Sequence, residues 1–234
     1  MDKITSIIIV HWGQNGFRSD LLRICLLSVI DTTKHLPAEI VVVDNGENFD
    51  DSGFLLGLVH NKKIQHYVRN SDNLYFGYAR NLGLDIALGE YIVISDNDIE
   101  YKQGWLDKCL KFLEQYPDKK YAITPLKTDR QHRQEKYWDG TVEFEGEDFL
   151  LNMRAGSNSW VMKRSRFDEV GKFRNHHIAG SHWADKFVNS GYRMATMEKN
   201  PLAKDLGFKK GYNIWLKASI GKTLTNGQVI YLNN

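Results

Sequence analysis

Three short apolar runs in the first hundred residues constrain the fold of this chain more than any other feature. They are residues 4–10 (ITSIIIV), 39–43 (EIVVV) and 90–95 (EYIVIS). Each run is rich in β-branched residues and too short for a core helix, which predicts strands that are buried on both faces. Helical patterns at residues 20–31 and 78–89 separate these runs. Alternating strands and helices predict right-handed crossovers and a mostly parallel, Rossmann-like α/β sheet.

Turn and cap residues mark where these elements begin and end. Ser19 is expected to cap the first helix, and Gly89 to end the second. Asp44-Asn45-Gly46 is a strong turn signal directly after the second strand. A weaker strand is expected at residues 64–68, so this half of the chain contributes four strands.

The pattern changes after residue 98, where a more polar, mixed α+β half begins. The expected elements are a helix at 105–116, a strand at 121–126, a hairpin at 137–144 around Asp139-Gly140, a strand at 159–162 and a helix at 166–170. No clear period follows Pro201. We therefore interpret residues 1–234 as one domain with halves at 1–98 and 99–200 and a C-terminal segment at 201–234.

Composition narrows the class of protein. The chain has 234 residues, with 31 Lys and Arg against 29 Asp and Glu, which gives a formal charge of +2. The length suits one domain, and the near balance of charge argues against a general nucleic-acid binder, which needs a basic face. No apolar run approaches the ~20 residues of a membrane span, and the N-terminus lacks a signal-peptide layout. We therefore expect a cytoplasmic location. Whether the chain is a fragment of a longer protein is left open.

Cysteine and lysine usage adds two expectations. Cys25 and Cys109 each lie in an apolar helical pattern, so buried thiols in a reducing compartment are expected rather than a disulfide. The C-terminal region carries scattered lysines at positions 204, 209, 210 and 217. They leave peripheral membrane attachment as an alternative to an ordinary solvated face.

Polar clusters follow three of the predicted strands. His11-Trp12 follows the first, Asp44-Asn45 the second and Asp96-Asn97-Asp98 the fourth. In parallel sheets, ligands bind outside the carboxyl ends of the strands. The sequence therefore predicts one ligand site that these clusters share.

The Asp96-Asn97-Asp98 cluster is the sharpest of the three. Two alternating carboxylates repel one another, and a divalent cation would relieve that repulsion. Oxygen ligands suit hard ions such as Mg²⁺ or Mn²⁺, which are typically shared with substrate phosphates. The alternative is a solvated acidic turn at the end of a strand.

Several of these segments together resemble family 2 glycosyltransferases with the GT-A fold. The segments are residues 6–12, 39–46, 73–83 (NLYFGYARNLG), 87–92 (ALGEYI) and 96–98, with looser matches at 159–164 and 167–173. The resemblance implies sugar transfer from a nucleotide-sugar. It also implies that the first half binds the nucleotide-sugar and that the second half faces the acceptor.

The resemblance implies roles for the residues around the predicted donor site. Asp44, beside Asn45, would hydrogen-bond the base or ribose. His11 and Trp12 stand where the family places a residue against the base, where an aromatic ring could stack. Arg80 would contact the base or the phosphates, with a solvated helix arginine as the alternative.

Within the acidic motif, the resemblance makes Asp98 the direct metal ligand, whereas Asp96 would contact the ribose or metal-bound water. Near the C-terminal segment, Lys204-Asp205-Leu206-Gly207 stands where some relatives carry His-Leu-Gly with a metal-binding His. Asp205 could replace that His, although an ordinary surface Asp is the preferred interpretation.

The catalytic base is where this chain departs from the family pattern. Inverting members usually supply the base from a Glu-Asp pair, whereas Ala184-Asp185 occupies that position here. Asp185 is the candidate base, and His182, on the same predicted helical face, is a weaker alternative. An inverting reaction is the expectation that the family implies.

Other polar and aromatic residues receive simpler interpretations. His176 and His177 with His182 fit no standard zinc spacing, so we reject a zinc site. Trp160 and Trp183 could form a platform for an acceptor sugar, with core packing as the equal alternative.

The resulting hypothesis is a Mn²⁺- or Mg²⁺-dependent glycosyltransferase. Its donor would be a nucleoside-diphosphate sugar, with UDP preferred over GDP or dTDP, and its acceptor a hydroxyl of a glycan, lipid-linked or protein partner. Ala184 favours one alternative, a degenerate domain that binds a nucleotide-sugar or glycan without turnover. A sugar nucleotidyltransferase is disfavoured because residues 11–20 lack a Gly-rich basic loop, and no dinucleotide fingerprint follows the first strand.

Overall fold

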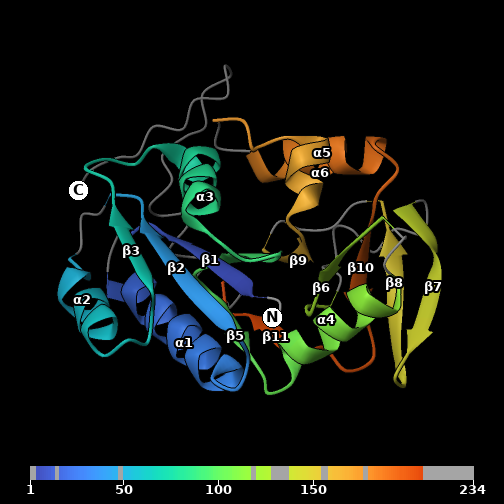
Figure 1. Ribbon diagram of the computed structural model, residues 1–234, viewed down its shortest axis with the longest axis horizontal. Coiled ribbons are helices and arrows are strands. Elements are labelled where there is room, and N and C mark those ends of the chain that lie inside the picture. Colours follow the sequence, from blue (N-terminus) through green and yellow to red (C-terminus); the bar gives the residue numbers. More distant parts are fainter. Residues whose placement is uncertain are drawn as a thin grey trace.

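The computed structural model describes residues 4–13, 16–46, 50–116, 120–127, 137–153, 158–175 and 179–207. Nine strands of this part form one sheet in the order β3-β2-β1-β4-β9-β6-β10-β8-β7, and β5 and β11 form a second, small sheet (Figure 1). The strands are β1 (Thr5–His11), β2 (Ala38–Asp44), β3 (His66–Arg69), β4 (Tyr91–Asp96), β5 (Ile99–Tyr101), β6 (Tyr121–Thr124), β7 (Trp138–Phe144), β8 (Glu147–Asn152), β9 (Ser159–Lys163), β10 (Arg193–Met197) and β11 (Ala203–Asp205). The helices are α1 (Gly16–Thr33), α2 (Ser52–His60), α3 (Tyr75–Ile86), α4 (Trp105–Gln115), α5 (Ser165–Val170) and α6 (Ala179–Asn189).

The first half of the chain forms the parallel part of the sheet. β1 pairs in parallel with both β2 and β4, and β2 pairs in parallel with β3. The chain therefore winds outward from β1 to β3 and then returns to the other side of β1 for β4. The strand order reverses between β1 and β4, and an open α/β sheet binds its ligands at such a switch point.

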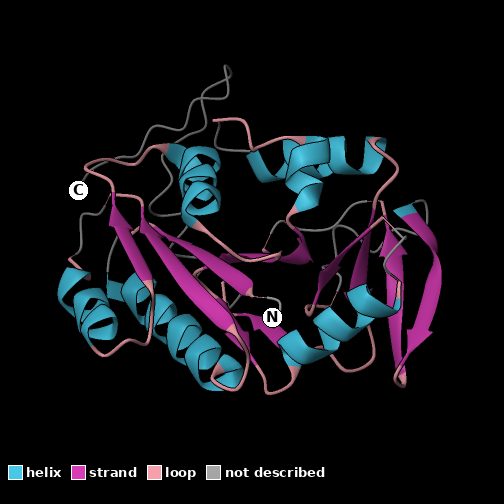
Figure 2. Cartoon of the chain, viewed as in Figure 1, coloured by secondary structure: helices cyan, strands magenta, loops and turns pink. Residues whose placement is uncertain are grey.

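Helices cover both faces of the sheet, as Figure 2 shows. Side chains alternate along β1: Ile7 and Ile9 pack into the core under α1 and α4, whereas Ile8 and Val10 pack under α3 and α6. A central strand that is buried on both faces must be apolar at every position, which explains the continuous ITSIIIV run.

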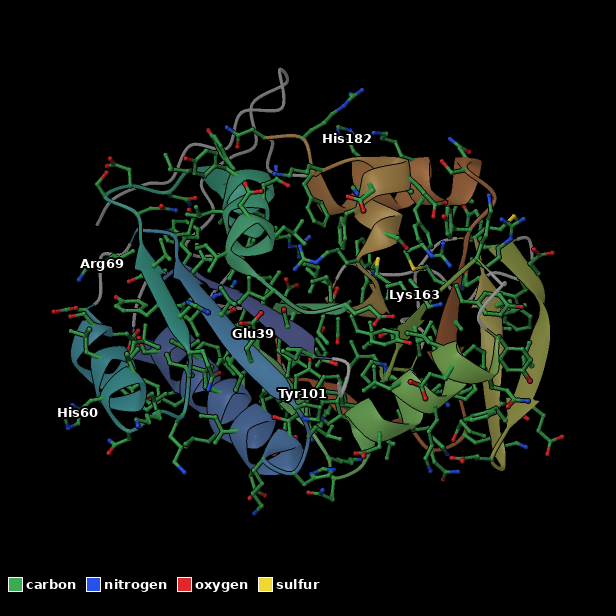
Figure 3. All side chains as sticks on the ribbon, viewed as in Figure 1. Glu39, His60, Arg69, Tyr101, Lys163 and His182 are labelled. Atoms are coloured by element: carbon green, nitrogen blue, oxygen red, sulfur yellow. The ribbon has the colours of Figure 1, made fainter. Side chains whose placement is uncertain are left out.

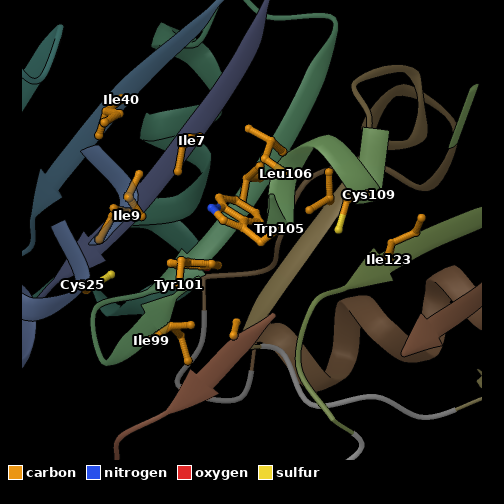
Figure 4. Packing of buried hydrophobic residues seen from close by; sticks show 14 of the residues in the cluster. Ile7, Ile9, Cys25, Ile40, Ile99, Tyr101, Trp105, Leu106, Cys109 and Ile123 are labelled. Atoms are coloured by element: carbon orange, nitrogen blue, oxygen red, sulfur yellow. The ribbon is translucent and has the colours of Figure 1, made fainter. Parts of the chain in front are cut away.

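Figure 4 shows the first of these two cores, in which Trp105 packs on Tyr101 with ring centroids 4.2 Å apart. The Trp105 indole N–H donates to Thr32 of α1 at 2.9 Å, so the polar edge of the ring is satisfied although the residue is fully buried. Cys25 and Cys109 are free and buried in this core, as expected. Burial raises the pKa of the Cys25 thiol to about 12.

Helix α3 lies unusually close to the sheet. A Cβ at Gly83 would come within 2.4 Å of the Ile8 side chain, so glycine is what allows this approach. Beyond the end of α3, the Arg164 Nε donates to the Gly89 carbonyl at 2.8 Å. These contacts fix the helix that carries Arg80.

The second half continues the same sheet with mixed directions. β9 lies antiparallel between β4 and β6, and β10 pairs in parallel with β6 and antiparallel with β8. β11 pairs antiparallel with β5, with Asp205 opposite Ile99. The mostly parallel sheet and the α+β second half were both predicted correctly.

Two local predictions are wrong. Ser19 does not cap a helix: α1 begins at Gly16, and the Ser19 hydroxyl donates to Asp51 at 2.5 Å. Asp139-Gly140 is no hairpin turn but lies within β7, where the register shifts. The turn between β7 and β8 is Glu145-Gly146, where both residues have positive φ, as the type I′ turn of a two-residue hairpin requires.

Candidate active site

The carboxyl ends of β1, β2 and β4 bring the predicted polar clusters together. His11 stands opposite Asp44 in the β1–β2 register, and Val10 stands opposite Asp96 in the β1–β4 register. The Asn45 amide N–H donates to the His11 carbonyl at 2.7 Å, so the pairing continues one step beyond β2. The single edge expected from the sequence is therefore present.

Asp44 is buried, and only one of its carboxylate oxygens is satisfied by the described residues. Oδ2 accepts a hydrogen bond from the Tyr67 hydroxyl at 3.1 Å and lies 3.7 Å from the Arg69 Nε. Oδ1 is buried and has no hydrogen-bond partner in the described part of the chain. Burial raises the pKa of Asp44, against the opposing effects of His11, Tyr67 and Arg69. Figure 3 shows Arg69 at the outer edge of the sheet.

Asn45 ties the end of β2 to the loop that precedes α3. Its Nδ2 donates to Asn73 at 2.9 Å, and its Oδ1 accepts from Asn70 at 3.0 Å and from the Leu74 amide at 3.2 Å. The next residue, Tyr75, begins α3 with φ of 64°, an uncommon value for a residue other than glycine. The Asn45 amide thus holds this irregular backbone against the site.

Arg80 is buried and forms an ion pair with the first Asp of the acidic motif. Its Nη2 donates to Asp96 Oδ1 at 2.7 Å, and the guanidinium lies 5.4 Å from the Phe173 ring centroid. The alternative of a solvated helix arginine is wrong. Burial raises the pKa of Asp96, and Arg80 opposes the shift.

Asp98 differs from Asp96 because its neighbours are mostly acidic. It is 8% exposed, and burial, followed by the charges of Asp96 and Asp205, raises its pKa to about 7. The cation beside it, Arg18 of α1, lies 3.6 Å from Oδ2. A cation bound next to this carboxylate would therefore stabilise its ionised form.

Asp205 is half-buried and lies beside Asp98, so it is more than an isolated surface carboxylate. The Asn158 amide donates to Asp205 Oδ2 at 2.5 Å, and the Gly207 N–H donates to Oδ1 at 2.8 Å. A Cβ at Gly207 would come within 2.4 Å of Asp98 Oδ2 and 3.2 Å of Asp205 Oδ1. The absence of a side chain at Gly207 is what lets both carboxylates approach this part of the backbone.

The carboxylate oxygens of Asp98 and Asp205 fit a hard divalent ion that shares its coordination with a substrate. Within the described ranges, no three His, Cys, Asp or Glu side chains converge to hold a metal by themselves. Asp96 already forms an ion pair with Arg80, so Asp98 and Asp205 are the carboxylates that could act as protein ligands. Mg²⁺ and Mn²⁺ are commonly held by one or two carboxylates together with phosphate oxygens.

His11 and Trp12 differ in exposure. His11 has no exposed surface, so its ring offers no face on which a base could stack, contrary to the sequence-based expectation. Trp12 is partly exposed, and base stacking on Trp12 stays a prediction. His11 instead contacts Asp51 and Asn97.

The candidate base lies on a different element. Asp185 is exposed on α6. His182, which is labelled in Figure 3, is partly exposed on the same helix. Helix α6 packs against α3. Trp160 and Trp183 are buried with ring centroids 5.2 Å apart, so they belong to the core and form no sugar platform. His176 and His177 lie outside the described residues.

Two residues of the site were missed by the sequence analysis. Arg18 follows the first strand in HWGQNGFRSD, where one arginine gave little signal. Asp51 is separated from its partner His11 by 40 residues, and no local pattern links them.

A model of glycosyl transferase family 2 matches residues 6–174 of the chain. The chain belongs to this family. It is 27% identical over 120 residues to a putative polypeptide N-acetylgalactosaminyltransferase 13 of Drosophila melanogaster, and 31% identical over 117 residues to the hyaluronan synthase of Pasteurella multocida. These matches cover 48% and 49% of this chain but only 21% and 12% of the relatives.

Solved glycosyltransferase structures share the fold. A mannosyltransferase from Pyrobaculum calidifontis in complex with GDP-Man and Mn²⁺ superposes with a TM-score of 0.70 and 20% identity, over 92% of this chain and 60% of that protein. GalNAc-T7 with UDP, GalNAc and Mn²⁺ superposes with a TM-score of 0.65 and 16% identity, over 92% of this chain and 48% of that protein. The family 2 chain thus has the expected GT-A fold. Among its described helices, none has the length and apolar character to cross a bilayer.

Proposed function

We propose that this chain is a metal-dependent glycosyltransferase that moves a sugar from a nucleoside-diphosphate sugar to a hydroxyl acceptor. The observation that carries the proposal is the position of Asp98 beside Asp205 at the switch point between β1 and β4. These two carboxylates, together with the neighbouring Arg80–Asp96 ion pair, make this edge suited to a diphosphate and its metal ion.

Asp44 and Trp12 are proposed to recognise the nucleoside. The buried Asp44 Oδ1 has an open hydrogen-bond position, which a base N–H or a ribose hydroxyl would fill. Trp12, at the end of β1, would stack on the base. UDP remains the preferred donor nucleotide, although the related structures hold both UDP and GDP-Man.

Asp98 and Asp205 are proposed to hold Mn²⁺ or Mg²⁺ together with the donor phosphates. Such an ion stabilises the negative charge that develops on the leaving diphosphate. Arg18 lies 3.6 Å from Asp98 in the first turn of α1, where its guanidinium would contact a phosphate oxygen. Arg80 favours the ionised form of Asp96 against the effect of burial and orients its carboxylate beside this position.

Asp185 is proposed to accept the proton of the acceptor hydroxyl in an inverting reaction. It is exposed on α6, a helix that contacts α3, so it can meet an acceptor that enters from solvent. The acceptor is a hydroxyl of a glycan, a lipid-linked sugar or a protein, and peripheral membrane contact through the lysine-bearing C-terminal region would serve a lipid-linked one.

Release of the nucleoside diphosphate tests this function without a known acceptor, because slow transfer to water also frees it. We expect release from UDP- or GDP-sugars that requires Mn²⁺ and stops with EDTA. Asp98→Asn should lose it, whereas Asp31→Asn, on the exposed end of α1, should retain it. Metal-independent release, or release unaffected by Asp98→Asn, would refute the proposal.

The second candidate is a domain that binds a nucleotide-sugar without turnover. Ala184, in place of the usual Glu, is the observation that favours it. This candidate predicts tight metal-dependent nucleotide binding with no release of diphosphate, even when a mixture of glycan acceptors is added.

A further inference from the structure

A buried histidine connects the acidic motif to a carboxylate that lies outside it. His11 ends β1, and its ring is fully buried. Its Nδ1 lies 2.7 Å from the side-chain nitrogen of Asn97, and its Nε2 lies 3.0 Å from Asp51 Oδ2. Asn97 is the residue between Asp96 and Asp98, so one ring spans the distance from the motif to Asp51.

The partners determine which ring nitrogen carries the proton. The Asn97 side-chain nitrogen can only donate, so His11 Nδ1 accepts and the proton is on Nε2, which donates to Asp51. Asp51 is itself buried and also accepts from the Ser19 hydroxyl at 2.5 Å and from Arg23 Nη2 at 3.3 Å. Burial alone would raise the pKa of Asp51, but the hydrogen bonds from His11 and Ser19 outweigh it and lower the pKa. Asp51, as the acceptor on the Nε2 side, therefore fixes the orientation of the His11 ring and keeps a proton on Nε2.

The Asn97 amide has a structural reason to need this acceptor. Residues 97 and 98 form the tight turn between β4 and β5, and Asn97 is 5% exposed. A buried amide N–H without an acceptor is unfavourable, so loss of Nδ1 would favour rotation of Asn97 and movement of the turn. Asp98 is the next residue, and its carboxylate would move with it.

We propose that His11 is a positioning residue for the metal site: fixed by Asp51, it holds the Asn97 side chain and thereby the turn that presents Asp98 to the cation. This inference rests on the proposed function, because the metal site is part of it. Hydrogen bonds behind a metal ligand orient it, and their loss typically weakens metal binding by about 10- to 100-fold. Here the support acts through one additional residue, and we expect a loss near the lower value.

Two amide substitutions separate the two hydrogen bonds of the ring. In His11→Asn, the side-chain oxygen lies as far from Cβ as Nδ1 does, so it can still accept from Asn97, while the contact with Asp51 is lost. In His11→Gln, the longer side chain can still donate to Asp51 but places no acceptor beside Asn97. Both variants leave a polar side chain at the same buried position.

The experiment titrates Mn²⁺ into each protein in the presence of UDP, and of GDP in parallel, with the unbound Mn²⁺ followed by its electron paramagnetic resonance signal. We expect His11→Gln to weaken Mn²⁺ binding about tenfold and His11→Asn to weaken it much less, even where His11→Asn has the lower melting temperature. Equal affinity in all three proteins would overturn the proposal. So would losses that simply follow the loss of melting temperature, because that result indicates a purely structural role.

A second readout does not depend on the metal. Nitrogen-15 spectra of the histidine rings, with His11 assigned by its disappearance in His11→Asn, should show a proton on Nε2 and an unprotonated Nδ1. A proton on Nδ1 would contradict the inference. If the wild-type protein binds no Mn²⁺ with either nucleotide, the proposed function fails and the positioning role fails with it, whereas a failure confined to His11 leaves the proposed function intact.

Discussion

The donor-facing edge of the sheet and the surface of α6 hold their candidate residues in opposite ways. Asp44, Arg80 and Asp98 are buried among polar partners that fix their positions, whereas Asp185 is exposed. A buried charge is tolerated only when its surroundings are specified, so the donor edge is rigidly defined by the fold. An exposed carboxylate on a helix has no such requirement. The structure therefore constrains the residues proposed for donor and metal binding more tightly than the residue proposed for the acceptor side.

Removing Asp98 should give the largest effect at the donor edge. We expect Asp98→Ala to abolish Mn²⁺-dependent UDP or GDP binding, because Asp205 alone cannot replace the pair of carboxylates. Isothermal titration calorimetry with and without Mn²⁺ measures this. Retained Mn²⁺-dependent affinity would remove Asp98 from the metal site, and Asp31→Ala provides an exposed control.

The Arg80–Asp96 ion pair allows a test of whether burial increases the contribution of an ion pair to stability. Arg80→Met leaves the Asp96 carboxylate without its cation, which should lower the free energy of unfolding by ~3 kcal/mol, within the range for breaking a buried pair. Lys172→Met breaks the exposed Lys172–Asp85 pair and should cost under ~1 kcal/mol. Urea denaturation of both variants gives the comparison, and equal costs would contradict the account.

Asp185 tests the acceptor side of the comparison. Asp185→Asn should keep nucleotide and Mn²⁺ binding, while transfer to an acceptor falls by roughly 10²-fold or more through loss of the general base. The measurement is single-turnover transfer once an acceptor is found. Unchanged transfer would show that the base is another group, and His182→Gln on the same helix is the first variant to examine.

The pH dependence of metal binding follows from the raised pKa of Asp98. Below about pH 7 a proton competes with the cation for this carboxylate, so Mn²⁺ affinity should fall by up to about tenfold per pH unit. In the metal-free protein, the folded state holds that proton more tightly than the unfolded state, whose pKa is near 3.8. Stability from this group is therefore greatest below pH 4 and declines as the pH rises toward 7. Titrations from pH 5.5 to 8.5, corrected for Mn²⁺–UDP binding without protein, would show no such slope if Asp98 were ionised throughout.

Gly207 should give the smallest effect. Gly207→Ala places a methyl group where the Asp98 and Asp205 oxygens now lie, and side-chain movement can relieve part of this overlap. We expect a loss of Mn²⁺ affinity on the order of threefold to tenfold with little change in stability, in keeping with disturbed ligand orientation. Gly57→Ala on α2, where a Cβ would meet no atom within 4 Å and the backbone is helical, controls for a general glycine effect on metal binding.

Much of the donor edge could be predicted because its sequence signals are local. The runs before His11, Asp44 and Asp96 are continuous and β-branched, and parallel pairing places their carboxyl ends side by side. The same reasoning failed at Asp139-Gly140, because a favourable turn pair was displaced by Glu145-Gly146, which lies where the β7 and β8 strands meet.

Residues whose place in the site was misjudged or missed depend on long-range pairing. Asp205 reaches Asp98 only because the three-residue strand β11 pairs with β5, about a hundred residues earlier. Asp51 reaches His11 across 40 residues, through a contact that leaves no periodic pattern in the sequence. Sequence patterns indicate which residues end a strand, but not which distant side chains surround them.

The most direct test of the central claim is the thermal stability of the wild-type protein with nucleoside diphosphates and nucleotide-sugars, each with and without Mn²⁺. A ligand that binds only the folded state raises stability by RT ln(1 + [L]/Kd), so no acceptor is needed. The account predicts a rise in melting temperature for one nucleotide class that requires Mn²⁺ and is absent in Asp98→Ala. A rise that is independent of Mn²⁺, or no rise with any nucleotide, would contradict it.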